Sequence, residues 1–139
     1  MKLKSYDENT SLRLGTSFSA GYDVASIEEI TIYPNTRKLI NTGLKLTYCP
    51  IHTYIRIAPR SGLSCKYLDV GGGVVDSDYR GFIKVLLINN SKLDYKVNIG
   101  DYVAQLIPTR VSTCGVFLDN MLLKCENERF DGGFGSTGK

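Results

Sequence analysis

The stretch Phe82-Ile83-Lys84-Val85-Leu86-Leu87-Ile88-Asn89 decides the fold of this chain. It is rich in Val, Ile and Leu, and the turn-forming residues Asn90 and Ser91 follow it, a pattern typical of a strand that ends in a turn. Its apolar side chains occupy both alternating positions, so the core could lie on either face. The stretch therefore predicts a strand buried between two sheets.

Further segments share this character, being short and rich in Val, Ile, Leu, Tyr and Thr: Glu28–Tyr33, Lys38–Tyr48, Thr53–Ala58, Tyr95–Ile99 and Tyr102–Val111. Turns with proline, asparagine or glycine separate them. Helical periodicity is nearly absent, and only Ser61–Tyr67 is predicted as a helix, of about two turns, with Ser61 as the candidate N-cap. Many short, evenly spaced strands predict an all-β sandwich, barrel or jelly roll.

Composition narrows the class of protein. The chain has 139 residues, 42% of them hydrophobic, and a net charge of +3, which suits one folded domain and excludes a disordered chain. The longest apolar runs, such as Val85–Ile88, are far shorter than the about 20 residues of a membrane helix. The opening Met1–Ser5 is too polar for a signal peptide. No basic block indicates nucleic-acid binding.

The cysteines indicate a reducing compartment. Cys49, Cys65, Cys114 and Cys125 form no Cys-x-x-Cys pair, which disfavours a zinc or redox motif and favours reduced thiols. With the polar start of the chain, this predicts a cytoplasmic or nuclear protein that is not secreted. We expect neither a membrane nor a nucleic-acid partner.

The segment Ala58-Pro59-Arg60-Ser61-Gly62-Leu63 is a candidate anion site. A predicted strand stops there at a proline and a short helix begins, so backbone N–H groups point outward and favour an anion. Arg60 adds a charged fork and Ser61 a hydroxyl donor, both suited to phosphate. An ordinary capped turn would explain the same residues.

A glycine-rich segment over 70–81 reads Val-Gly-Gly-Gly-Val-Val-Asp-Ser-Asp-Tyr-Arg-Gly. A hairpin needs only one or two glycines at its turn. Three in a row beside valines therefore predict that a flat ligand lies against the backbone. A tight hairpin with solvated acids is the alternative.

Two other places break the strand pattern. Gln105 lies in an apolar strand, where a buried amide must be paired, and the pattern alone favours a structural cross-strand hydrogen bond. The final segment, Arg129–Lys139, places an aromatic ring, two hydroxyls and an arginine on a glycine-rich chain. It predicts either a mobile arm that becomes ordered over a ligand or a disordered terminus.

Together these segments resemble the trimeric dUTPase family. Its five motifs are matched in the family order by Ala20–Asp23, Ala58–Leu63, Gly73–Gly81, Gly100–Ile107 and Gly133–Gly138, and the resemblance covers almost the whole chain. It implies a distorted jelly-roll β-barrel with one short helix over residues 1–128, and a flexible C-terminal arm over 129–139 that closes over the active site. It also implies a homotrimer whose active sites are shared between subunits.

The resemblance implies hydrolysis of dUTP to dUMP and pyrophosphate by attack of water at the α-phosphate. Such an activity limits uracil incorporation into DNA and supplies dUMP for dTMP synthesis. Asp76 matches the aspartate that activates the water, and Tyr79 matches the ring that packs on deoxyribose. Backbone around Gly73 and Val74 matches the edge that reads uracil. The family uses Mg²⁺ held mainly by the substrate phosphates, so no direct metal ligand is expected.

The remaining matches concern the phosphates and the base. The implied phosphate ligands of the body of the domain are Arg60, Ser61, Gly62 and Gln105, and Asp23 matches an aspartate that supports the site structurally. In the arm, the implied substrate contacts are Arg129, Ser136 and Thr137 for the γ-phosphate, Phe134 for stacking on uracil, and Gly135.

Two other classes of function are disfavoured. A catalytically silent member of this fold that acts by binding a partner would be expected to lack Asp76 or the arm, and both are present. A dCTP deaminase, which shares the fold, needs a glutamate base beside the ring, and Gly73–Tyr79 contains none.

Overall fold

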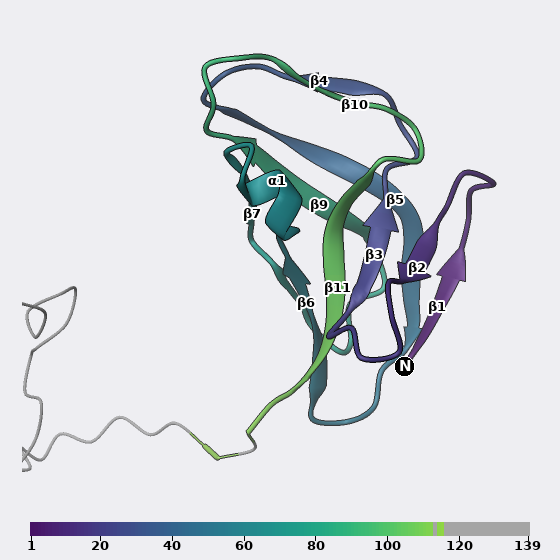
Figure 1. Ribbon diagram of the computed structural model, residues 1–139. Helices are drawn as coiled ribbons and strands as arrows, with labels where there is room; N and C mark the ends of the chain where they lie inside the picture. The colour runs from purple at the N-terminus through teal and green to yellow at the C-terminus, as the bar shows by residue number, and fades with distance from the viewer. Residues whose placement is uncertain (113, 116–139) are drawn as a thin grey trace, which may run out of the picture.

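The computed structural model describes residues 1–112, 114 and 115. In this part of the chain, antiparallel strands form three sheets, and one short helix lies beside them (Figure 1). The elements are β1 (Lys2–Ser5), β2 (Leu12–Leu14), β3 (Tyr22–Ala25), β4 (Ile30–Ile32), β5 (Thr36–Tyr48), β6 (Thr53–Ala58), α1 (Ser61–Ser64), β7 (Leu68–Gly71), β8 (Val74–Val75), β9 (Phe82–Asn89), β10 (Tyr95–Val97) and β11 (Tyr102–Arg110).

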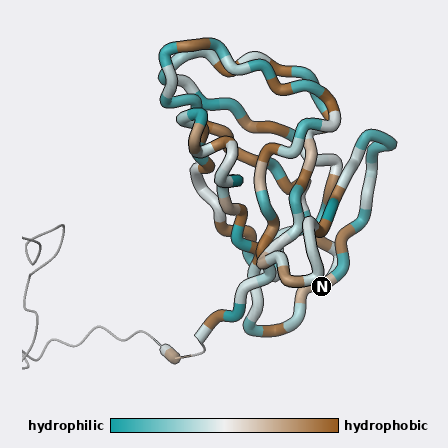
Figure 2. The backbone as a smooth tube through the Cα atoms, in the orientation of Figure 1, coloured by the Kyte–Doolittle hydropathy of each residue, from teal (hydrophilic) through white to brown (hydrophobic). Residues whose placement is uncertain are grey.

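The core lies between the two larger sheets. One sheet has the strand order β1-β5-β9-β7, the other has the order β2-β3-β11-β6-β8, and β10 and β4 pair separately at one end of the molecule (Figure 1). A continuous buried cluster draws residues from both sheets, among them Ile40 and Val85 from the first and Ile57 and Leu106 from the second. Brown and teal positions alternate along much of the chain in Figure 2, as expected when strands present one side to a core. The all-β prediction is confirmed.

Strand β9 is fully buried on one face only, whereas its sequence predicts burial on both faces. Alternate residues from Ile83 to Asn89 are fully buried, whereas Lys84 is exposed and Leu86 and Ile88 are half-buried. The fully buried phase faces the second sheet, and the other phase forms an outer surface on which apolar side chains are only partly covered. The interpretation of β9 as a strand buried on both sides is therefore correct for one face and only partly so for the other.

The end of β9 is fixed by a fully satisfied buried amide. Asn89 donates from Nδ2 to the carbonyl oxygens of Ile32 at 2.9 Å and Leu93 at 2.8 Å, and its Oδ1 accepts from the Ser91 N–H at 2.9 Å. A buried amide that lacked these partners would be costly. The side chain therefore ties β4 and the turn after β9 to the main sheet.

The predicted helix is shorter than expected and begins differently. It spans Ser61–Ser64, about one turn, and its N-cap is Arg60, which makes no side-chain cap hydrogen bond. Ser61 is thus the first helical residue, not the N-cap as predicted. Hydrogen bonds to the carbonyls of residues 63 and 64 continue the turn, and the chain then reverses at Tyr67, whose φ is 62°. A residue with this φ cannot continue a right-handed helix.

The strand predictions differ from the structure mainly at short elements. The predicted ranges Thr53–Ala58 and Phe82–Asn89 are those of β6 and β9, and the other predicted ranges end within a few residues of β4, β5, β10 and β11. The strands β1, β2, β3, β7 and β8 were not predicted. They span two to four residues each, which is too short for an alternating pattern to be recognised. Within the described residues no helix is both long and apolar enough to cross a membrane.

Candidate functional site

A polar pocket lies where three strands of the five-stranded sheet meet the start of α1. We call it the Arg60 pocket; its volume is about 390 Å³ and its lining residues are Asp23, Arg60, Ser61, Gly62, Leu63, Lys66 and Gln105. Gln105 of β11 is paired with Asp23 of β3 on one side and with Ala58 of β6 on the other. Side chains at directly paired positions share one face of a sheet, so this register brings Asp23 and Gln105 together beside the end of β6.

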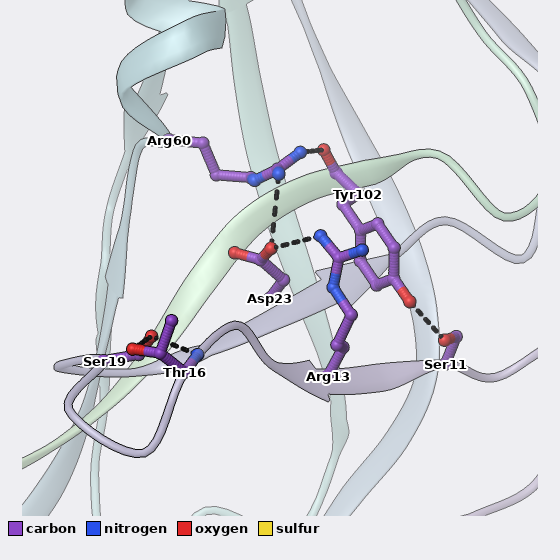
Figure 3. Close-up of polar contacts among 7 residues, drawn as sticks. All are labelled: Ser11, Arg13, Thr16, Ser19, Asp23, Arg60 and Tyr102. Atoms are coloured by element: carbon purple, nitrogen blue, oxygen red, sulfur yellow. Dashed lines mark hydrogen bonds and ion pairs between the residues drawn. The ribbon is translucent and has the colours of Figure 1, made fainter.

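Arg60 is held in place by two acceptors. Its Nη1 donates to the backbone carbonyl of Tyr102 at 2.9 Å, and its Nη2 lies 3.2 Å from Asp23 Oδ2 (Figure 3). The Asp23 side chain is largely buried, and the Arg60 side chain is about one-third exposed. A guanidinium carries five N–H donors, so these two contacts orient the group and leave donors for a ligand in the pocket.

The backbone at the start of α1 supplies further donors. The first N–H groups that bond within this turn are those of Leu63 and Ser64, which both donate to the Arg60 carbonyl at 2.9 Å. The Ser61 and Gly62 N–H groups precede them and are among the groups that a helix start leaves without an internal partner. Because both residues are exposed on the wall of the Arg60 pocket, they are placed to donate to an anion.

Gln105 faces the pocket. It is half-exposed, and in the described part of the chain its side-chain amide makes no hydrogen bond across the sheet. The cross-strand bond favoured by the sequence pattern is therefore wrong, and the amide is available to a ligand. A half-exposed position explains this outcome, because water can satisfy an amide that is not fully buried.

The glycine-rich segment packs against its own chain. A side chain at Gly73 would collide with the carbonyl oxygen of Ile57, and the Ile57 N–H donates to the Gly73 carbonyl at 2.8 Å. Gly72 has a φ of 58°, which glycine adopts without strain. Close approach of β6 and a backbone reversal thus explain these two glycines, and the prediction that a ligand lies against all three is not needed to account for them.

The carbonyl of Val74 is nevertheless open at the sheet edge, whereas its N–H donates to the Gly72 carbonyl at 3.0 Å. Arg56 pairs with Val74, and on one side of this pair the Ile57 N–H bonds to the Gly73 carbonyl, while on the other side Ile55 pairs with Val75. At such a position in an antiparallel ladder the backbone groups point away from the partner strand. Since β8 is the edge strand of its sheet, the Val74 carbonyl faces outward, where a base could pair with it.

Asp76 and Tyr79 lie on the turn after β8. The Tyr79 N–H donates to the Asp76 carbonyl at 3.1 Å, and the Tyr79 hydroxyl donates to the Phe82 carbonyl at 3.1 Å. A side chain at Gly81 would collide with the Tyr79 ring, so the glycine makes room for the ring to lie along the chain. The Asp76 carboxylate is exposed to solvent.

Within one chain these two groups of residues are apart. The register of β6 and β8 places Val75, the residue before Asp76, opposite Ile55, three residues before Ala58, which is about 10 Å along the strand. The structure therefore brings Asp23, Arg60, Ser61, Gly62 and Gln105 together in the Arg60 pocket. It does not place Gly73, Val74, Asp76 or Tyr79 in the lining of that pocket.

Comparison with known proteins assigns the family. A family model described as dUTPase matches residues 7–138. The chain belongs to the dUTPase family. It is 49% identical over 121 residues to the deoxyuridine 5'-triphosphate nucleotidohydrolase of Rabbitpox virus (strain Utrecht), an alignment that covers 87% of this chain and 80% of the relative. It is also 49% identical over 120 residues to the enzyme of the same name from Monkeypox virus, covering 86% and 78%.

Solved dUTPase structures share the fold. The dUTPase of Staphylococcus bacteriophage 80alpha with dUpNHpp matches with a TM-score of 0.86 and 22% identity over 99% of this chain and 98% of that one. A mutant dUTPase of phage phi11 of S. aureus, solved with a structural Mg(II) ion, matches with a TM-score of 0.78 and 22% identity over 88% and 98%. The predicted jelly roll, the predicted family and the predicted enzyme class, a dUTP-hydrolysing enzyme, are confirmed.

The described residues contain no cluster of side chains suited to bind a metal ion. Among residues 1–112, 114 and 115, no three His, Cys, Asp or Glu side chains gather in a way that could hold a metal ion. The one carboxylate of the Arg60 pocket, Asp23, is already engaged by arginine. This donor set does not fit a metal held by protein ligands alone.

The sequence did not predict some residues of the site, and some predicted residues lie outside the part of the chain that the structure describes. Lys66 lines the Arg60 pocket and was not predicted; it follows Gly62 by four residues, and this helical spacing was the available signal. Arg13 and Tyr102, which contact Asp23 and Arg60, were also missed. The predicted substrate contacts of the arm, Arg129, Phe134, Gly135, Ser136 and Thr137, lie outside the described residues.

Proposed function

We propose that this protein hydrolyses dUTP to dUMP and pyrophosphate by attack of a water molecule, activated by Asp76, at the α-phosphate. The observation that carries the proposal is the Arg60 pocket in a chain of the dUTPase family. One wall combines an oriented guanidinium, two backbone N–H groups and a carboxamide. Such donors stabilise phosphate charge without having to move during the reaction.

In this proposal Asp76 activates the attacking water and Tyr79 packs on the sugar. An exposed carboxylate on a turn can accept a proton from water as the water attacks, and Asp76 has this exposure. Tyr79 is anchored through its hydroxyl to the Phe82 carbonyl, which presents the ring to a sugar. A ring packed on deoxyribose leaves no room for a 2′-hydroxyl, and the outward Val74 carbonyl offers an acceptor for uracil.

The complete site requires more than one copy of this chain. Arg60 and Asp76 act on the same triphosphate in this proposal, yet Arg60 lines the pocket beyond the end of β6 and Asp76 lies on the turn after β8, away from that end. A homotrimer with shared sites resolves this, because a closed ring of identical subunits can juxtapose two different surfaces at every interface. The half-covered outer face of β9 and the exposed Val74 provide apolar surface for such contacts.

Mg²⁺ enters this proposal with the nucleotide. When bound, it neutralises part of the triphosphate charge. The residues of this chain then hold the remaining phosphate oxygens through Arg60, Ser61, Gly62 and Gln105, and Asp23 keeps Arg60 oriented. We further propose that residues 129–139 close over the bound nucleotide, with Phe134 on the base and Arg129, Gly135, Ser136 and Thr137 as the remaining substrate contacts. The family match that extends to residue 138 supports a functional role for this segment.

We propose a cytoplasmic or nuclear location, in which the activity limits uracil incorporation into DNA and supplies dUMP. Cys65 and Cys114 are free and exposed, and Cys49 is free and half-buried. Exposed free thiols persist in reducing compartments and are unusual in secreted proteins.

A nucleotide panel tests the function. Pyrophosphate release would be followed with dUTP, dCTP, dTTP and UTP, and we expect turnover of dUTP alone. The mismatched hydrogen-bonding edge of cytosine and the 2′-hydroxyl of UTP are strongly rejected, and the methyl group of thymine is rejected by steric clash. Asp76→Asn is expected to lower kcat by about 10² to 10⁴ without unfolding the protein. Near-normal turnover in that variant would remove Asp76 from its role, and equal turnover of all four nucleotides would contradict the substrate assignment.

A further inference from the structure

A second arginine, Arg13, shares the carboxylate that orients Arg60. Arg13 Nη2 lies 2.9 Å from Asp23 Oδ2, the same oxygen that Arg60 Nη2 approaches at 3.2 Å (Figure 3). Arg13 is paired with Asp23 across β2 and β3, just as Gln105 is paired with Asp23 across β11 and β3. Arg13 therefore extends the row of side chains that leads into the Arg60 pocket, although it does not line that pocket itself.

Tyr102 links the two arginines. The Arg13 guanidinium carbon lies 4.3 Å from the centre of the Tyr102 ring and the Arg60 guanidinium carbon 5.6 Å from it, both within the range of a cation–π contact. The backbone carbonyl of Tyr102 accepts from Arg60 at 2.9 Å, and its hydroxyl is within 3.0 Å of Ser11 Oγ. The Tyr102 hydroxyl and backbone carbonyl are thus each engaged, and the ring lies beside both guanidinium groups.

The charges of this cluster do not cancel. An isolated Asp23–Arg60 pair would be neutral, and a neutral pair attracts a triphosphate weakly. With Arg13 on the same carboxylate oxygen, two positive charges share one negative charge. These three side chains therefore carry a net charge of about one positive unit beside the pocket, in addition to the charge of Lys66 on the pocket wall. The partly buried position of Asp23 reduces the screening of these charges by solvent and salt.

We propose that Arg13 is a positioning residue for the triphosphate of dUTP. It acts through Asp23: by taking a share of the carboxylate, it keeps Arg60 oriented while leaving the charge of Arg60 uncompensated for phosphate. The inference rests on the proposed dUTP hydrolysis. It also assigns a role to β2, a three-residue strand at the edge of the five-stranded sheet.

Arg13→Gln, Arg13→Lys and a matched control test this role. Lys96→Gln is the control, because Lys96 forms an ion pair of 2.9 Å with Glu29 at an exposed position of β10, so it loses the same charge and one ion pair. The measurements are KM and kcat for dUTP at two salt concentrations, the dissociation constant of dUpNHpp, and the unfolding temperature of each variant.

We expect Arg13→Gln to raise KM and the dUpNHpp dissociation constant about three- to tenfold with kcat within about twofold, because binding charge is lost and the attacking groups are intact. Its KM should also depend less on salt than that of the unaltered protein. Arg13→Lys should recover most of the loss, and Lys96→Gln should change neither constant. Tyr102→Leu, which keeps the backbone carbonyl but removes the ring, should raise KM as well, and it provides a second test if Arg13→Gln folds poorly.

The outcomes separate this inference from the function on which it rests. If the unaltered protein releases no pyrophosphate from dUTP, the proposed function fails. If the unaltered protein is active and Arg13→Gln matches Lys96→Gln in KM and in salt dependence, the role of Arg13 fails and the function stands. A fall in kcat at constant KM would also overturn it, because a positioning role in binding predicts the opposite split.

Discussion

The Ile57 N–H donates a hydrogen bond to the Gly73 carbonyl at 2.8 Å, and this bond fixes the separation between the two halves of the proposed site. It holds β8 against β6 in a register that places Asp76 away from the C-terminal end of β6. Arg60, the N-cap of α1, lies just beyond that end. Small movements of either side chain cannot bridge about 10 Å of strand. A second copy of the chain is the simplest source of the missing half.

Two inactive variants should therefore restore each other. Arg60→Gln and Asp76→Asn are each expected to lower turnover about 100-fold or more. If chains of the two variants are mixed in equal amounts, denatured and refolded together, about a quarter of the shared sites would combine an intact Arg60 with an intact Asp76. Pyrophosphate release should then recover to about a quarter of the unaltered level.

The double variant Arg60→Gln/Asp76→Asn, refolded with Asp76→Asn, is the matched control, since no mixed site then holds an intact Asp76. It should stay inactive. Light scattering would report a trimer in every sample. A mixture no more active than its separate components would show that each chain supplies both residues of its own site.

Gly73→Ala tests whether the glycine-rich segment is a packing requirement. The new side chain would collide with the Ile57 carbonyl, and relief of such overpacking typically costs about 1–3 kcal/mol of the free energy of unfolding. Gly62→Ala is the matched substitution, because nothing lies within 4 Å of that position and it is helical. Denaturant unfolding should show a loss for Gly73→Ala and no loss for Gly62→Ala. Equal stabilities would mean that the β6–β8 contact is not tight in solution.

The sequence predicted the long strands and the motif residues, but not the distances between them. β6 and β9 were predictable because six to eight residues suffice for a recognisable apolar pattern. Arg13 and Asp23 lie on strands of three and four residues, and their contact depends on register across the sheet, which local pattern does not determine. Gln105 was misread because an apolar strand does not reveal that one of its positions opens on a pocket. The separation of Arg60 from Asp76 follows from the pairing of β8 with β6, a contact between residues far apart in the chain.

Tyr95 should make stability fall at alkaline pH. Burial raises the pKa of the Tyr95 phenol above its ordinary value of 10.0, the negative charge of Asp101 raises it further, and Arg60 partly opposes the rise. At pH values between the pKa of Tyr95 in the unfolded chain and its higher pKa in the folded protein, only the folded protein keeps the phenol proton. The folded state then binds more protons, so the free energy of unfolding decreases as pH rises. The contribution is complete below pH about 10 and is lost as pH rises through the folded pKa.

Tyr95→Phe removes this titration. Its unfolding free energy should therefore decline less than that of the unaltered protein above pH about 10. Tyr33→Phe, at an exposed position, should follow the unaltered protein throughout. Urea unfolding at several pH values gives the comparison, and parallel curves for Tyr95→Phe and the unaltered protein would contradict the raised pKa.

Removal of Mg²⁺ should affect turnover and not folding. The described residues gather no group of three metal-ligating side chains, and Asp23 is engaged by Arg13 and Arg60, so we expect Mg²⁺ to bind with the triphosphate. EDTA should then abolish pyrophosphate release and added MgCl₂ should restore it, while the unfolding temperature without nucleotide stays the same. A metal held in the folded protein would instead stabilise it by mass action and raise that temperature. A fall in the unfolding temperature on EDTA treatment would thus reveal a structural ion, as in the phage phi11 dUTPase solved with a structural Mg(II) ion, and would require ligands outside the described residues or between subunits.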